Sequence, residues 1–146
     1  MPKETPDHHD AELVLRAYEL RRDPVMRDSR RSMLYEFWPQ SADEAAALVR
    51  TDHPLNAAYR QVTTYWEMIY GMVRHGVVHA EYFLETNVEG LFVFAKLAPY
   101  LERLRAEHTP LVLRNAEWVA RECPPGQRLF EVISARVRRL AEARKR

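Results

Sequence analysis

The stretch that decides the fold covers residues 54–75 and reads PLNAAYRQVTTYWEMIYGMVRH. Its apolar side chains recur at alternating intervals of four and three residues, which is the spacing of one face of an α-helix. This seam consists of Leu55, Tyr59, Val62, Trp66, Ile69 and Val73, and a second apolar strip beside it consists of Ala58, Tyr65, Met68 and Met72. A helix that is apolar on two faces needs neighbours on both, so we expect this segment to be a central helix.

A second apolar stretch covers residues 87–108. It is apolar around most of its circumference near its start, where Val88, Leu91, Phe92, Val93, Phe94 and Leu97 lie. Pro99 falls inside this stretch, where a proline either kinks a helix or begins a new one. Between the two stretches, Gly76 suits the left-handed position that follows many helices. We therefore expect two central helices, at 54–75 and 87–108.

Polar motifs mark where further helices begin. Asp23-Pro24 and Thr109-Pro110 each place a capping oxygen before a proline at the first helical position. Residues 41–44 and 86–89 read SADE and TNVE, and both fit the capping box. Apolar spacing and these signals together predict helices over residues 8–22, 24–38, 41–50, 54–75, 79–85, 87–108, 110–123 and 126–144.

The predicted fold is an all-α, single-domain bundle of about six to eight helices. It spans residues 1–146, and we expect residues 1–7 and 143–146 to be frayed. The chain is 47% hydrophobic and 29% charged, with four Gly, nine Pro and one Cys. This composition excludes the collagen-like, low-complexity and disulfide-scaffold classes of protein.

Charge and cysteine content set an expectation for location. The 19 Arg and three Lys nearly balance 21 acidic residues, which leaves a formal net charge of +1. The single cysteine, Cys123, cannot form an intramolecular disulfide, and this favours a reducing compartment. The N-terminus lacks the apolar run of a signal peptide. No apolar stretch approaches the length of about 18 residues that a transmembrane helix needs. We expect a cytoplasmic protein without a membrane span.

Two groups of residues resemble metal ligands. His75 and His79 are four residues apart, but a glycine between them is expected to break the helix. Residues 7–10 read DHHD, in which Asp7 as an N-cap and Asp10 in the first turn also suit a helix start. Metal binding by either group stays open at this point. None of the six histidines follows a glutamate by three residues, as di-iron bundles require, so we expect no metal or cofactor.

The sequence contains no familiar catalytic motif. A Gly-x-Ser-x-Gly elbow, a Gly-rich phosphate loop and a dinucleotide-binding fingerprint are all missing. Cys123 precedes Pro124-Pro125-Gly126 at an expected helix C-terminus, where the helix dipole disfavours a thiolate. We interpret Cys123 as an inert thiol and predict no catalytic residue, which favours a protein that is not an enzyme.

One carboxylate in the central helix differs from its surroundings. Glu67 lies between Trp66 and Met68, where most neighbouring side chains are expected to be buried. A buried carboxylate needs a hydrogen-bonding or charged partner. We expect that Tyr59, Trp66, Glu67 and Tyr70 could line a ligand cavity. The alternative is a packed core from which Glu67 faces water.

The last eleven residues, 136–146, carry six basic side chains. A nucleic-acid-binding protein would use such a strip for phosphate contacts. The same side chains also suit the negative C-terminal end of a helix. No aromatic residues alternate with them and the overall charge is close to zero, so nucleic acid is not the expected partner.

Several short motifs between residues 56 and 123 resemble those of a known family; they are Gly76-Val77-Val78, Glu81-Tyr82-Phe83, Phe94 through Leu97, and Pro99-Tyr100-Leu101 with Arg105. In these motifs the chain resembles a family of uncharacterised bacterial helical domains, classed as a domain of unknown function. The resemblance implies an all-helical bundle. It implies no known activity, so no functional residue is carried over. Many members follow a membrane-anchoring helix, whereas this sequence shows no such span.

Three functions remain in view. We expect a non-enzymatic interaction or regulatory module that self-associates, because three Trp, seven Tyr and five Phe exceed what one small core needs. The expected partner is a second copy in a homodimer, with an unknown protein as a further possibility. The alternatives are a small-molecule-binding or catalytic bundle with its cavity at Tyr59, Trp66, Glu67 and Tyr70, and nucleic-acid binding through the basic C-terminal helix.

Overall fold

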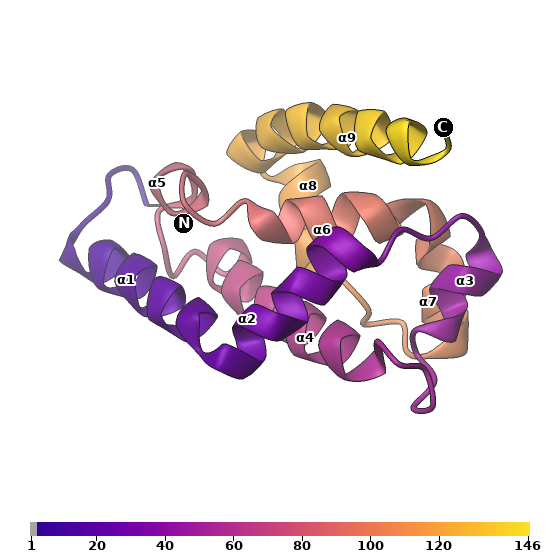
Figure 1. Cartoon of the computed structure of the whole chain (residues 1–146). Coiled ribbons are helices and arrows are strands. Elements are labelled where there is room, and N and C mark those ends of the chain that lie inside the picture. The colour runs from indigo at the N-terminus through magenta and orange to yellow at the C-terminus, as the bar shows by residue number, and fades with distance from the viewer. Residues whose placement is uncertain (1–2) are drawn as a thin grey trace.

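A computed structural model describes residues 3–146, and every regular element in that range is a helix (Figure 1). The α-helices are, in chain order, α1 (His8–Arg22), α2 (Pro24–Arg31), α3 (Ala42–Ala47), α4 (Asn56–Arg74), α5 (Ala80–Leu84), α6 (Glu89–Leu97), α7 (Leu101–Glu107), α8 (Arg114–Glu122) and α9 (Pro124–Arg144). A π-helical turn, η1 (Ser32–Glu36), continues α2, and a 3₁₀ turn, η2 (Ala98–Tyr100), separates α6 from α7. The predicted all-α bundle is confirmed. Residues 1 and 2 of the expected frayed segment lie outside the described residues.

Helix α4 is the centre of the bundle, with α2 crossing one side of it and α8 packed on another. Nine of its 19 residues are buried, including Tyr59, Trp66 and Ile69 of the predicted seam. One member of the second strip does not follow the prediction, because the Met68 side chain is 54% exposed. Helices α2 and α8 cover two sides of α4 and leave this third side open.

Helix α6 is the second central helix, and seven of its nine residues are buried. Helix α9 lies along α6 and α8 and forms the outer layer across the top of the view in Figure 1. Only Gly126 and Val137 of α9 are buried, so most of this long helix remains accessible. Within residues 3–146, no helix has both the length and the apolar character that crossing a bilayer requires.

Several predicted helix boundaries are confirmed by their hydrogen bonds. Asp7 caps α1 in a complete capping box with Asp10. Asp23 caps α2 by accepting from two backbone N–H groups, and the Ser41 side chain caps α3. Gly76 follows α4 with a φ of 72°, the left-handed conformation that a side chain disfavours. These boundaries were predictable because each depends on contacts within one turn of the chain.

Other predicted boundaries are wrong, because tertiary contacts override the local signals. Thr86 does not cap a helix, since α6 begins at Glu89 and the buried side chain of Asn87 faces the core instead. Thr109-Pro110 begins only a turn, and α8 starts at Arg114. The predicted helix at 87–108 is divided by η2, so a new helix does begin after the proline at position 99.

The junction between α8 and α9 is tighter than the sequence predicts. Helix α9 begins at Pro124 rather than at residue 126. Cys123 therefore ends α8 and is also the N-cap residue of α9. Gly126 lies directly against α8, where an added Cβ would overlap the backbone carbonyl of Val119. Cys123 was expected at a helix C-terminus. It does end α8, but it also lies at the N-terminus of α9.

Candidate functional site

The four residues proposed as a cavity lie on two different sides of α4. Tyr59 and Glu67 border a surface groove that also involves the turn after α7. Trp66 and Tyr70 point into the core and are 1% and 0% exposed. All four residues therefore belong to α4, but they do not line one common cavity.

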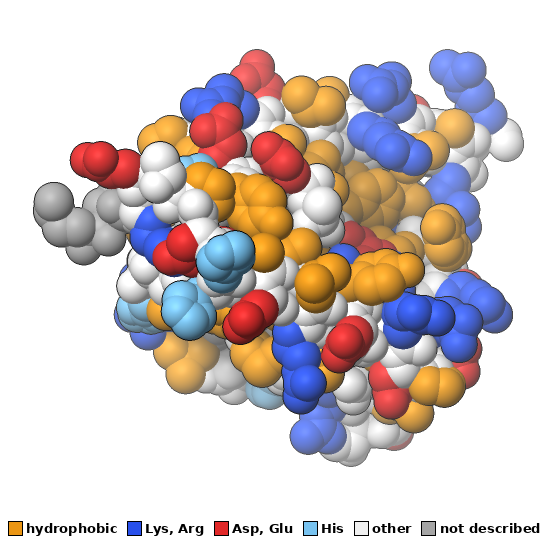
Figure 2. Space-filling view, turned by 90° about the vertical axis from the view of Figure 1, so that its left-hand side faces the viewer, with side chains coloured by type: hydrophobic (Ala, Val, Ile, Leu, Met, Phe, Trp, Pro, Cys, Tyr) orange, Lys and Arg blue, Asp and Glu red, His pale blue; other side chains and the backbone are white. Residues whose placement is uncertain are grey.

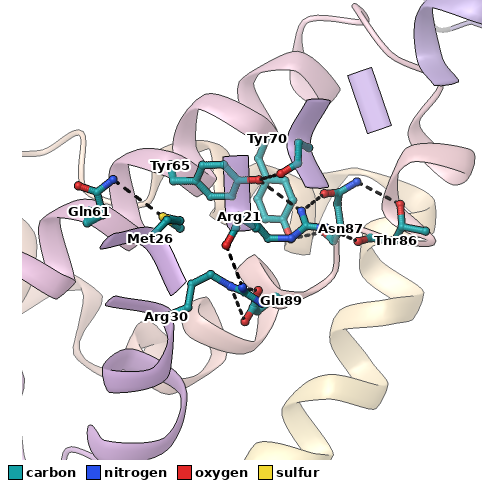
Figure 3. A network of polar contacts seen from close by, with 10 residues as sticks. Arg21, Met26, Arg30, Gln61, Tyr65, Tyr70, Thr86, Asn87 and Glu89 are labelled. Carbon is teal, nitrogen blue, oxygen red and sulfur yellow. Dashed lines mark hydrogen bonds and ion pairs between the residues drawn. The ribbon is translucent and has the colours of Figure 1, made fainter. Parts of the chain in front are cut away.

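Tyr70 belongs to a buried polar network, shown in Figure 3, and Trp66 packs beside this network. The Tyr70 hydroxyl donates to the Asn87 carbonyl at 2.7 Å and accepts from the Leu91 N–H at 3.1 Å. The Arg21 guanidinium donates to the Asn87 side-chain oxygen at 2.6 Å and lies over the Trp66 ring, 5.6 Å from its centre. Burial raises the pKa of Tyr70 well above its usual value. This network joins α1 to α4 and to the start of α6.

The close packing of this network leaves no room for a ligand between the rings. A Cβ added at Gly90 would approach Tyr70 to 2.6 Å and Trp66 to 2.8 Å. Beside it, Arg30 donates to both carboxylate oxygens of Glu89, at 2.9 and 3.2 Å. The network therefore holds α1 and α2 in place. Trp66 contributes only its ring, because its buried indole N–H has no hydrogen-bond partner among residues 3–146.

Glu67 serves the N-terminus of α8. Its two carboxylate oxygens accept from the backbone N–H groups of Asn115 and Ala116 at 2.8 and 2.9 Å. The Asn115 side chain donates in return to the Glu67 carbonyl at 3.0 Å. The side chain of the α8 N-cap residue forms no capping hydrogen bond. Glu67, on the neighbouring helix α4, provides the capping acceptor instead. Burial raises the pKa of Glu67, and these N–H groups act in the opposite direction.

Replacing Glu67 with glutamine is expected to lower the free energy of unfolding by about 1 kcal/mol. Glutamine can place its oxygen on one N–H of α8, but its amide group then faces the second N–H. Urea denaturation of both proteins measures the difference. The exposed Glu12→Gln on α1 is the matched control and should change stability little. Equal stability of wild type and Glu67→Gln would contradict this assignment.

The outer face of α4 carries a groove, here called the α4 groove, made of two adjoining hollows. One hollow, of about 490 Å³, lies between α4 and the turn from α1 to α2. The other, of about 360 Å³, lies between α4 and the turn from α7 to α8. Thr64 borders both of them. Three large apolar side chains remain exposed along the groove, namely Leu20 at 38%, Met68 at 54% and Leu111 at 60%.

The turn that forms one wall of the α4 groove has an unusual backbone. Leu113 has a φ of 53° and is the one residue other than glycine with a positive φ in the described chain. Its side chain and that of Val112 are buried, while Leu111 points outward. Strained residues of this kind cost about 1–3 kcal/mol and concentrate at functional sites. No sequence signal predicts this conformation, because leucine rarely adopts it.

A separate cavity, here called the junction cavity, brings together residues that the sequence singled out. It has a volume of about 610 Å³ and lies between the end of α4, the start of α5 and the α8–α9 junction. His75, His79 and Cys123 all border it. Figure 2 faces the end of the molecule with α1 and α5, where histidines lie beside hydrophobic and acidic side chains. Within residues 3–146, no three side chains of metal-binding type come together.

The acidic N-terminal segment contributes to the same end of the molecule. Asp10 is fully buried and accepts from the His79 N–H at 2.8 Å. Lys3 lies 3.1 Å from Asp10 and 3.0 Å from Asp7. Asp10 is desolvated, but its bonds with the Asp7 and His79 N–H groups and with Lys3 hold its pKa below the usual value. The DHHD segment thus anchors α1 to α5.

Cys123 is buried at 3% exposure. Burial raises the pKa of its thiol, while the Gly126 N–H and the Arg128 charge act in the opposite direction. The thiol therefore stays protonated at neutral pH despite its position at the start of α9. Burial, rather than the expected dipole of a helix C-terminus, is therefore what disfavours the thiolate.

The most unusual charged residue in the structure is Lys96, a lysine within the apolar stretch of residues 87–108. It lies in the apolar part of α6, is 5% exposed, and donates to the carbonyls of Met33 and Leu34 at 2.6 and 3.3 Å. Its ammonium is 4.1 Å from the centre of the Trp38 ring, and the Phe37 and Phe92 rings lie within 6 Å. Burial lowers the pKa of Lys96 to about 7. We call these surrounding carbonyls and aromatic rings the Lys96 cage.

The basic C-terminal segment lies on the accessible side of α9. Arg144 stacks over Trp38 at 5.3 Å and so closes the outer side of the Lys96 cage. Arg136, Arg138 and Arg139 are exposed. At least one of the six basic residues therefore packs against an aromatic ring, which was not expected from the sequence.

Comparison with known proteins places the chain in a family without giving it an activity. No curated protein and no solved structure matches the chain. A match to one family extends over residues 6–123, which includes α1 through α8 and stops at the α8–α9 junction. This range is longer than residues 56–123, in which the short motifs resembled a family. The matched family is likewise a domain of unknown function. The chain belongs to the family described as Domain of unknown function (DUF4760).

Proposed function

We propose that this chain is a non-enzymatic helical interaction module that self-associates through the α4 groove. The observation that carries the proposal is the set of exposed apolar side chains, Leu20, Met68 and Leu111, which three separate elements direct to one surface. Apolar side chains grouped around a hollow mark contact surfaces more often than single exposed ones do. Methionine adapts well to such contacts because its side chain is flexible and polarizable.

A second copy of the chain fits this surface because the groove is self-complementary in charge. Arg60 lies one turn before Thr64 on the exposed side of α4, and Asp23 borders the groove beyond Thr64. In the described part of the chain, neither side chain forms an ion pair. An antiparallel two-fold contact centred on Thr64 would place Arg60 of each copy near Met68 and Asp23 of the other.

The decisive substitution is Thr64→Arg. Thr64 is exposed, so an arginine is tolerated in the monomer, but at a two-fold axis the new charge meets its own copy. We expect the dissociation constant of the dimer to rise at least tenfold, or about 1.4 kcal/mol. Light scattering combined with size-exclusion chromatography measures the molar mass over a concentration series.

The matched control is Thr51→Arg, because Thr51 is exposed in a turn away from the α4 groove. This control should keep the wild-type mass at each concentration. A wild-type protein that is monomeric at tens of micromolar would overturn self-association. An unchanged dimer in Thr64→Arg would show that a different surface is used.

A further inference from the structure

The junction cavity is separate from the α4 groove and plays no part in the proposed self-association. Its volume of about 610 Å³ lies in the range of about 300–1,000 Å³ that is usual for small-molecule sites. Five parts of the chain border it: the N-terminal segment at Lys3, the end of α4 with the loop to α5, the start of α5, the end of α8 and the first two residues of α9. It is a half-open cavity with helix ends on several sides, which gives a small ligand both a wall to pack on and a route of entry.

The walls of the cavity combine an apolar surface with two fixed donors. Val73 and Val78 are buried there, and the Trp118 ring contributes an aromatic face. Arg74 is held by a bond from its guanidinium to the Asn115 side chain at 3.2 Å, which leaves its other N–H groups available. His79 accepts from the Tyr82 N–H through Nδ1 at 3.1 Å, so its own proton is on Nε2.

The other charged residues that border the cavity do not neutralise the charge of Arg74 or occupy these donors. Lys3 is already paired with Asp7 and Asp10. Glu81 and Glu122 are exposed at the rim, and the Glu81 side chain is 67% exposed with Arg128 at 3.8 Å. Solvent screens charges of this kind strongly. The half-buried Arg74 and His79 therefore offer a guanidinium and an imidazole N–H to the cavity, whereas the two acids that also line it are exposed to solvent.

We propose that the junction cavity binds a small carboxylate with an apolar or aromatic body. The carboxylate would bond to the Arg74 guanidinium and to the His79 Nε2–H, since a guanidinium matches the geometry of a carboxylate. The body of the ligand would lie against Val73, Val78 and Trp118. This site depends on α9 for part of its wall, although α9 lies beyond the family match.

A pair of probes that differ only in charge tests the proposal. Benzoate and benzylamine carry the same ring, but only benzoate matches the donors. Cys123 borders the cavity and is the only cysteine in the chain, so a small thiol reagent such as methyl methanethiosulfonate modifies the protein at this one position. Intact-mass measurements over time at mildly alkaline pH give the rate at which Cys123 is modified.

We expect benzoate at ten times its dissociation constant to slow the modification of Cys123 about tenfold, with benzylamine having little effect. Arg74→Met should abolish the protection, whereas the exposed Arg50→Met should retain it. Circular dichroism checks that both variants fold, and the comparison of the two probes in the wild type does not depend on either variant. Equal protection by both probes, protection by neither, or protection that persists in Arg74→Met would overturn the proposal.

Discussion

Replacing Gly126 with alanine is expected to lower the free energy of unfolding by about 3 kcal/mol, at the upper end of what overpacking costs. The added methyl group would overlap the Val119 carbonyl, a backbone group of α8 that no side-chain rotation can move. The two helices must then separate, and α9 loses part of its packing on α6 and α8. Thermal unfolding should show a midpoint about 10 °C below that of the wild type.

Gly71→Ala on α4 is the matched control, because it adds the same group to another glycine inside a helix. There the new Cβ meets only the end of the Asn115 side chain, at 3.1 Å. Alanine also favours the helix over glycine by about 1 kcal/mol, so this variant should be as stable as the wild type or more so. A Gly126→Ala midpoint within the error of the wild-type value would contradict the tight α8–α9 junction.

The second large effect is a rise in stability with pH that depends on Lys96. Its pKa is about 7 in the folded protein, below the value of 10.5 for an unperturbed lysine. Between these two values the unfolded chain binds more protons than the folded chain, so the free energy of unfolding increases as the pH rises. From pH 7 to pH 9 the gain is at most about 2 kcal/mol. It is a maximum because two carbonyls and an aromatic face favour the charged ammonium.

Lys96→Met should lose this pH-dependent gain, because methionine has a similar shape and no titrating group. Arg144 is the charged group that faces the cage from α9, and it stays charged across this range, so it contributes no slope of its own. Urea denaturation at pH 7, 8 and 9 measures the effect for both proteins, with the exposed Lys145→Met as a control. A parallel rise in wild type and Lys96→Met would assign the pH dependence to other groups.

Much of the fold was predictable because it follows from local chemistry. The apolar seam of residues 54–75 predicted a buried central helix, and the capping residues at positions 7, 23 and 41 located three helix starts. The predictions were wrong where a partner far along the chain decides the local conformation. Asn87 is held by Arg21, and α8 begins where Glu67 supplies its N-terminal acceptor.

The candidate sites were less predictable than the fold. For Glu67 the sequence left open whether it lines a cavity or faces water; in the structure its carboxylate accepts from two backbone N–H groups that are 48 and 49 residues away. In the sequence, His75 and His79 were considered as a pair and Cys123 separately, and only the approach of α4, α5 and α8 places all three around one cavity. Lys96 gave a weak signal, as a charged residue within an apolar helix, but its cage depends on η1.

By itself, the sequence determined that this protein is an all-helical bundle organised around two apolar helices, because helical periodicity and capping are properties of neighbouring residues. Only the tertiary structure decided which face of α4 stays open and where the α8–α9 junction forms one wall of a cavity. It also decided how the charge of Lys96 is buried. These features arise where segments distant in sequence meet, and the pattern of residues along one segment does not specify its packing partner.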